Sequence, residues 1–181
     1  ALPKSGGWMN TLKVVLGFIE LGLAFKFLSN ADLVQHWGIF KREVFIGIWI
    51  AIVLGLVLYL FGKIKFPHDP KTVSIKAPRV IVGILFSAFL IYLIPGLTNT
   101  SYANLKLLSG FPPPLFYSVY EKDTKGPLGL KAYNDFEKGR KIADEQNKPI
   151  LLDFTGYACV NCRKMEEQVW SKPQIYDMIK D

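Results

Sequence analysis

Between Lys148 and Trp170 the chain has the sequence K-P-I-L-L-D-F-T-G-Y-A-C-V-N-C-R-K-M-E-E-Q-V-W. This segment holds the only two cysteines of the chain, Cys159 and Cys162, with two residues between them. The apolar run before them, residues 150–154, predicts a buried strand. After the cysteines, apolar side chains recur at helical spacing: Met165, Val169 and Trp170. We therefore expect the C-x-x-C at a strand-to-helix turn, where the helix N-terminus stabilises a thiolate and favours redox chemistry.

A single C-x-x-C is compatible with three kinds of site. A zinc site needs further ligands, but no second cysteine pair follows. The two histidines, His36 and His68, lie in loops that the membrane spans predicted below place on opposite sides of a membrane. A structural disulfide suits an oxidising compartment, but a bond closing so small a ring restricts the unfolded chain little. Redox exchange is therefore the favoured interpretation.

Apolar residues are concentrated in the first hundred positions of this 181-residue chain. Residues 1–97 carry 10 Lys and Arg against 4 Asp and Glu, whereas residues 98–181 carry 12 against 11. The excess positive charge thus accompanies the apolar half, where basic residues usually flank membrane spans. The second half has no basic patch interleaved with aromatic residues, which argues against nucleic-acid binding.

Three apolar segments within residues 1–97 predict transmembrane helices at about 8–28, 44–62 and 80–97. The second segment has no charged residue and is long enough to cross a bilayer at about 1.5 Å per residue. The first segment is interrupted by charged residues: Lys13, Glu20 and Lys26. An ionisable group in a span is a functional candidate, although Glu20 could instead pair with a helix outside this chain.

The charges between the predicted spans indicate their orientation. The loop between the second and third spans holds Asp69 and five basic residues: Lys63, Lys65, Lys71, Lys76 and Arg79. By the positive-inside rule this loop is cytoplasmic, so both cysteines lie in an extracytoplasmic compartment. Residues 98–130, which contain Pro112-Pro113-Pro114, are predicted to form an extracytoplasmic linker, and residues 131–181 to begin a folded domain.

The pattern L-L-D-F-T-G-Y-A-C-V-N-C-R-K-M resembles the active site of the thioredoxin family. The resemblance implies that Cys159 is the exposed nucleophile and that Cys162 resolves the mixed disulfide. Asp153 matches the family's buried acid and would take or relay the proton of Cys162, because a half-buried carboxylate can act as a base. The alternative for Asp153 is a solvated residue at the end of a strand.

The sequence departs from the thioredoxin pattern in three ways. Ala158 stands where thioredoxins usually carry Trp, and Val160-Asn161 replaces the usual Gly-Pro between the cysteines, so the reduction potential cannot be carried over. Few residues follow Cys162, and the later strands and cis-proline loop of the family are missing. We expect an internal piece of a longer protein, with the fold class of membrane all-α helices followed by a truncated α/β thioredoxin-like domain.

Both ends of the chain resemble the DsbD family of thiol:disulfide interchange proteins. Residues 2–18 are similar to the sixth transmembrane helix of that family, and residues 148–174 to the start of its C-terminal thioredoxin-like domain. The resemblance implies a multi-pass protein of the bacterial inner membrane with the C-x-x-C in the periplasm. It also implies that electrons from cytoplasmic thioredoxin arrive through earlier helices, which are not present here, and pass on to periplasmic disulfide-bearing proteins.

Three functions therefore compete. The first is a protein-disulfide reductase that carries reducing equivalents across the lipid bilayer by dithiol/disulfide exchange. The second is a membrane-tethered thioredoxin-like reductase for cytochrome c maturation, whose helices are only an anchor. The third is a transporter-like bundle with a non-catalytic interaction domain. The exchange chemistry requires no metal, nucleotide or flavin, and the sequence contains no Gly-rich phosphate loop.

Overall fold

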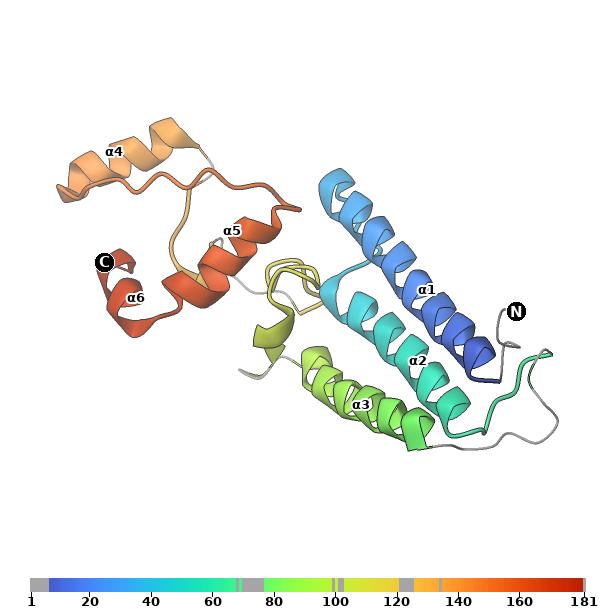
Figure 1. Cartoon of the computed structure of the whole chain (residues 1–181). Coiled ribbons are helices and arrows are strands. Elements are labelled where there is room, and N and C mark those ends of the chain that lie inside the picture. The colour runs from blue at the N-terminus through green and yellow to red at the C-terminus, as the bar shows by residue number, and fades with distance from the viewer. Residues whose placement is uncertain are drawn as a thin grey trace, which may run out of the picture. The chain divides into compact units, whose positions relative to one another are not determined.

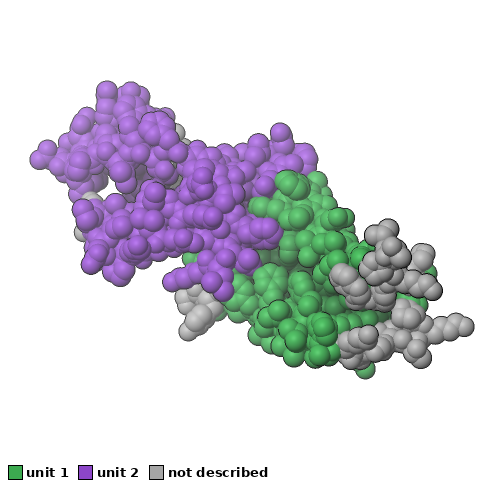
Figure 2. All heavy atoms as spheres, in the orientation of Figure 1, with its two compact units in different colours: residues 1–29, 43–105 green, residues 30–42, 106–181 purple. Residues whose placement is uncertain are grey.

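A computed structural model describes residues 7–67, 69, 77–98, 100, 103–120, 126–133 and 135–180 (Figure 1). The chain divides into two compact units, which Figure 2 colours separately. Unit 1 comprises Ala1–Ser29 and Glu43–Leu105, and unit 2 comprises Asn30–Arg42 and Lys106–Asp181. The predicted loop residues His68, Lys71 and Lys76 lie outside the described residues.

Helices occupy all three apolar segments, and they lie side by side in Figure 1. They are α1 (Gly7–Gln35), α2 (Arg42–Leu60) and α3 (Ala77–Leu93), and a 3-10 turn, Ile94–Leu97, continues α3 through Pro95. Within the described part of the chain, two segments are long and apolar enough to span a membrane: Arg42–Leu60 and Ala77–Leu97, with mean hydropathies of 2.4 and 2.5. A membrane-spanning role for α1 stays a prediction.

Small residues allow the three helices to approach one another closely. A Cβ at Gly22 of α1 would lie 2.9 Å from the Trp49 ring of α2, and one at Gly83 of α3 would lie 3.2 Å from the Phe61 ring. Helices in an apolar medium associate through close packing of this kind. The medium is as apolar as the helix surfaces, so the hydrophobic effect does not drive the helices together. The core of unit 1 centres on three buried residues of α2: Leu56, Tyr59 and Leu60.

Unit 2 contains short helices joined by irregular segments. They are α4 (Phe136–Gln146), α5 (Val160–Met165), a π-helical turn (Glu166–Trp170) that continues α5, and α6 (Pro173–Ile179); shorter 3-10 turns are Lys106–Leu108 and Pro127–Gly129. The Asp135 side chain caps α4 by accepting the Lys138 N–H at 3.0 Å. Asn147 ends α4 in the left-handed conformation at φ 51°.

The buried strand expected at residues 150–154 is not found. No strand is assigned anywhere in the described residues, and the apolar side chains of this segment are exposed, with Leu151 at 66% and Phe154 at 90%. A strand exists only when its backbone pairs with another strand, and no described residue pairs with this one. The helical part of the expected fold class is therefore observed, and its α/β part stays a prediction.

A buried carboxylate in unit 2 holds the loop that joins α1 to α2. Asp32, fully buried, accepts the N–H groups of Ile39 and Phe40 at 3.0 Å and the Tyr117 hydroxyl at 2.8 Å. The Arg42 guanidinium, also buried, donates to the carbonyl of Pro113. Residues 113–117 of the predicted linker are thereby fastened to residues 32–42.

Candidate active site

The two cysteines form a disulfide at the start of α5. Their Cα atoms are 5.3 Å apart, and both residues are half-buried. Cys159 is the N-cap residue, and its Sγ accepts the backbone N–H of Cys162 at 3.2 Å. The sequence thus correctly predicted a helix beginning at the C-x-x-C. A sulfur that accepts a backbone N–H gains stability when it carries negative charge, so this arrangement favours a thiolate at Cys159.

Asp153, the third predicted site residue, is exposed. The sequence-based expectation placed it half-buried on a strand, and without that strand its side chain lies at the surface. The structure therefore brings the two cysteines together and leaves Asp153 outside any buried environment. Its proposed role in proton transfer stays a prediction.

The sequence analysis missed a buried ion pair on the helix that carries the cysteines. Arg163 and Glu166 are each 5% exposed, and the Arg163 Nη1 lies 2.8 Å from the Glu166 Oε2. Arg163 also donates from Nη2 to the Thr155 hydroxyl at 2.6 Å, and its guanidinium lies 5.2 Å from the centre of the Phe116 ring. The i, i+3 spacing of Arg163 and Glu166 on a predicted helix was the pattern that could have revealed this pair.

Burial changes the chemistry of the Glu166 carboxyl. Desolvation by burial, together with the negative charges of Asp153 and Glu167, raises its pKa to about 7 against the opposing effect of Arg163. A carboxyl with this pKa exchanges protons near neutral pH, unlike an ordinary glutamate. Glu166 lies one helical turn after Cys162, so a proton-exchanging group is present on the dithiol helix.

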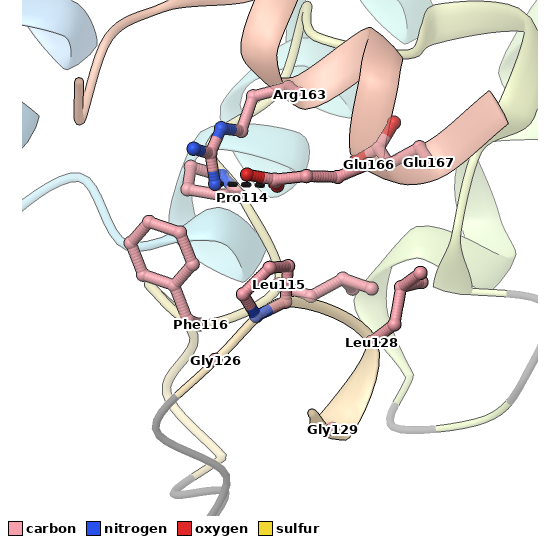
Figure 3. A pocket seen from close by; sticks show the side chains of 10 residues that line it. Pro114, Leu115, Phe116, Gly126, Leu128, Gly129, Arg163, Glu166 and Glu167 are labelled. Atoms are coloured by element: carbon pink, nitrogen blue, oxygen red, sulfur yellow. Dashed lines mark ion pairs between the residues drawn. The ribbon is translucent and has the colours of Figure 1, made fainter. Parts of the chain in front are cut away.

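A cavity of about 290 Å³ adjoins this ion pair (Figure 3). Figure 3 shows the Arg163–Glu166 pair on one side and Phe116, Leu115 and Leu128 across from it. Its walls are mainly apolar, so the cavity has few groups that would fix a polar cofactor. The described residues also contain no group of three or more His, Cys, Asp or Glu side chains that could hold a metal ion.

Comparison with known proteins finds relatives that cover nearly the whole chain. A family model described as thioredoxin-like matches residues 131–181. The thiol:disulfide interchange protein DsbD of Pseudomonas fluorescens is 29% identical over 99% of this chain and 28% of its own length. The protein of the same name from Pseudoalteromonas atlantica is 25% identical over 99% of this chain and 27% of its own length. No solved structure matches the chain.

The similarity covers the helices of unit 1 as well as the C-x-x-C segment. The DsbD of Campylobacter jejuni, for example, is 25% identical over 98% of this chain. The chain spans between a quarter and a third of the length of these curated relatives. It covers 29% of the length of the Campylobacter protein. The expected resemblance is confirmed, and the chain is a homologue, along nearly its whole length, of the DsbD family of thiol:disulfide interchange proteins.

Proposed function

We propose that this chain functions in protein-disulfide reduction. It would pass reducing equivalents across the bacterial inner membrane, from cytoplasmic thioredoxin to periplasmic disulfides. The observation that carries this proposal is the Cys159–Cys162 disulfide at the start of α5, in a chain homologous to DsbD. A dithiol at a helix N-terminus is suited to exchange because one of its thiols ionises readily.

The reaction begins with the reduced pair. The Cys159 thiolate attacks one sulfur of a partner disulfide, the partner's S–S bond breaks, and its leaving thiolate takes a proton. Cys162, after losing its proton, attacks the Cys159 Sγ and releases the partner's second thiolate, which is protonated in turn. The chain's dithiol is oxidised to a disulfide and the partner's disulfide is reduced to a dithiol, with two electrons and two protons transferred.

Proton acceptance from Cys162 is assigned to Asp153 in this proposal, as the resemblance to thioredoxins implies. Because Asp153 is exposed, it can pass the proton accepted from Cys162 on to bulk water. Its negative charge also acts on Glu166, a second carboxyl able to exchange protons near neutral pH. The reaction itself calls for no metal, nucleotide or flavin.

Electron delivery through the membrane is favoured over a simple anchor. A helix that only anchors a soluble domain needs length and hydrophobicity, not a particular sequence. The DsbD relatives match the helical half and the dithiol half of this chain in a single alignment. The positive-inside distribution of Lys63, Lys65 and Arg79 supports a periplasmic location for the cysteines.

Thiol trapping in cells that express the protein tests this function. Acid quenching followed by alkylation with a mass tag gives the reduced fraction of the Cys159–Cys162 pair, with and without cytoplasmic thioredoxin. We expect a mostly reduced pair that becomes oxidised when thioredoxin is removed. A pair whose redox state does not depend on cytoplasmic thioredoxin would overturn the transmembrane delivery of electrons and favour a tethered reductase.

A further inference from the structure

The predicted linker touches the C-x-x-C at Val160, the first of the two residues between the cysteines. Gly110 is buried and has a φ of +74°, and a Cβ built on it would lie 2.9 Å from the Val160 Cγ1 and 3.0 Å from the Val160 carbonyl oxygen. Contact this close is compatible with glycine alone. The backbone at Gly110 therefore lies directly against the C-x-x-C.

Aromatic side chains make a second contact just before Cys159. The Tyr157 ring packs edge-on against His36, with centroids 4.3 Å apart, and against Phe116 at 6.5 Å. These edge-to-face arrangements are the favourable geometry for aromatic pairs. Phe116 also contacts Arg163 on the far side of the cysteines. We call the three contacting residues, His36, Gly110 and Phe116, the cradle.

Two cradle residues, His36 and Phe116, lie beside a hydrogen-bond network centred on the buried Asp32. Asp32 holds the loop that carries His36, and the Tyr117 hydroxyl donates to Asp32 while accepting the N–H of Gly38 at 2.8 Å. The backbone N–H of Arg42 donates to the Tyr117 carbonyl at 2.9 Å. Phe116 is next to this anchored tyrosine, so the same hydrogen bonds constrain its backbone.

We propose that the cradle is an intramolecular docking surface for the C-x-x-C. It covers the surface through which a protein partner would have to approach Cys159. A partner disulfide must approach the Cys159 Sγ, and the cradle contacts Tyr157 and Val160, which lie within two residues of Cys159 in the sequence. A small thiol reaches a half-buried disulfide past such a contact, whereas a protein has to displace it. The proposal rests on the exchange function above and adds to it a selection by partner size.

Two variants release the cradle by different means. In Gly110→Ala the new methyl group collides with Val160, and in the double variant His36→Ala/Phe116→Ala the ring contacts to Tyr157 are lost. Gly17→Ala is the control for the first, because a Cβ added at Gly17 of α1 would meet no atom within 4 Å. Trp37→Ala is the control for the second, since Trp37 is a neighbouring ring with 55% of its surface exposed.

The measurement is the rate at which the Cys159–Cys162 disulfide of the full 181-residue chain, purified in detergent, is reduced by two reagents. Dithiothreitol is the small probe, and a reduced bacterial thioredoxin is the protein-sized probe. We expect the ratio of the thioredoxin rate to the dithiothreitol rate to rise about tenfold in both cradle variants. The reason is that the disulfide is open to a protein-sized reagent in a larger fraction of the molecules. In both controls the ratio stays at the wild-type value.

The outcomes separate the two proposals. If the wild-type disulfide reacts with both reagents and both cradle variants leave the rate ratio unchanged, the cradle is overturned and the exchange function stands. If the double variant raises the ratio, the cradle is supported even where Gly110→Ala fails to fold. A wild-type disulfide that neither reagent reduces overturns the exchange function, and the cradle with it.

Discussion

The residues before Cys159 and those after Cys162 differ in structure, although both were expected to be regular. Before the cysteines, residues 150–154 are irregular, and the Phe154 side chain is 90% exposed. After them, residues 160–170 are continuously helical and bury Arg163 and Glu166 to 5% exposure. A helix satisfies its backbone within its own segment, whereas a strand depends on a partner elsewhere in the chain. Regular backbone structure beside the cysteines is therefore found on the helical side.

The largest expected effect is at the boundary between these two sides. Cys159→Ser removes the proposed nucleophile and should lower disulfide exchange by at least about 10³-fold, because the remaining thiol of Cys162 has no second cysteine to resolve a mixed disulfide. Cys162→Ser should instead accumulate a mixed disulfide between Cys159 and the partner, visible on a non-reducing gel. Unchanged exchange in Cys159→Ser would support a non-catalytic interaction domain.

A second prediction tests the helix that follows the cysteines. Arg163→Ala leaves the Glu166 carboxyl buried without its cation and also removes the donor to Thr155. We expect a loss of about 3 kcal/mol of local stability, measured by amide hydrogen exchange in residues 155–170.

Arg140→Ala is the matched control for Arg163→Ala. It also removes an arginine from an i, i+3 ion pair, but Arg140 and Glu137 have side chains 56% and 71% exposed. An exposed pair of this kind contributes about 0.5 kcal/mol or less. Equal exchange protection in the two variants would show that the Arg163–Glu166 pair does not stabilise the dithiol helix.

The difference between the two sides also explains which parts of the fold the sequence could predict. Apolar runs and helical periodicity correctly indicated α1, α2, α3 and the helix that follows the cysteines, since these elements depend on neighbouring residues. The predicted strand at 150–154 depended on a pairing partner that no local pattern supplies.

The same division holds for the candidate site. The spacing of Cys159 and Cys162 was sufficient to predict a dithiol at a helix start. The contacts of Gly110 with Val160 and of His36 with Tyr157 join segments far apart in the sequence, and no motif marks them. Asp153 was placed by resemblance to a strand-borne acid, so its burial was lost together with the strand.

A third prediction concerns the pH dependence of the dithiol helix. The pKa of Glu166 is raised to about 7 in the folded chain from an ordinary value of 4.5, so the folded state binds more protons than the unfolded state between these values. Stability should therefore fall as pH rises from about 4.5 to 7, by an amount on the order of 1–3 kcal/mol. Hydrogen-exchange protection of residues 160–170, corrected for intrinsic rates, measures this change.

Glu166→Gln should abolish that pH dependence, because the amide has no proton to lose in this range. Glu137→Gln on exposed α4 is the control and should leave the pH dependence at its wild-type value. A pH dependence that persists in Glu166→Gln would assign the titration to another group.

The smallest expected effect connects the irregular side to the helical one. The negative charge of Asp153 contributes to the raised pKa of Glu166, so Asp153→Asn should lower the midpoint of the pH-dependent protection by a few tenths of a unit, about the size expected for a solvent-screened charge. The proton-acceptor role predicts something different: resolution of the mixed disulfide should slow by about 10²-fold in Asp153→Asn. Stopped-flow exchange and hydrogen exchange on the same variant separate these effects. A shifted midpoint with an unchanged resolution rate would make Asp153 a residue that tunes Glu166, and would remove it from the catalytic residues.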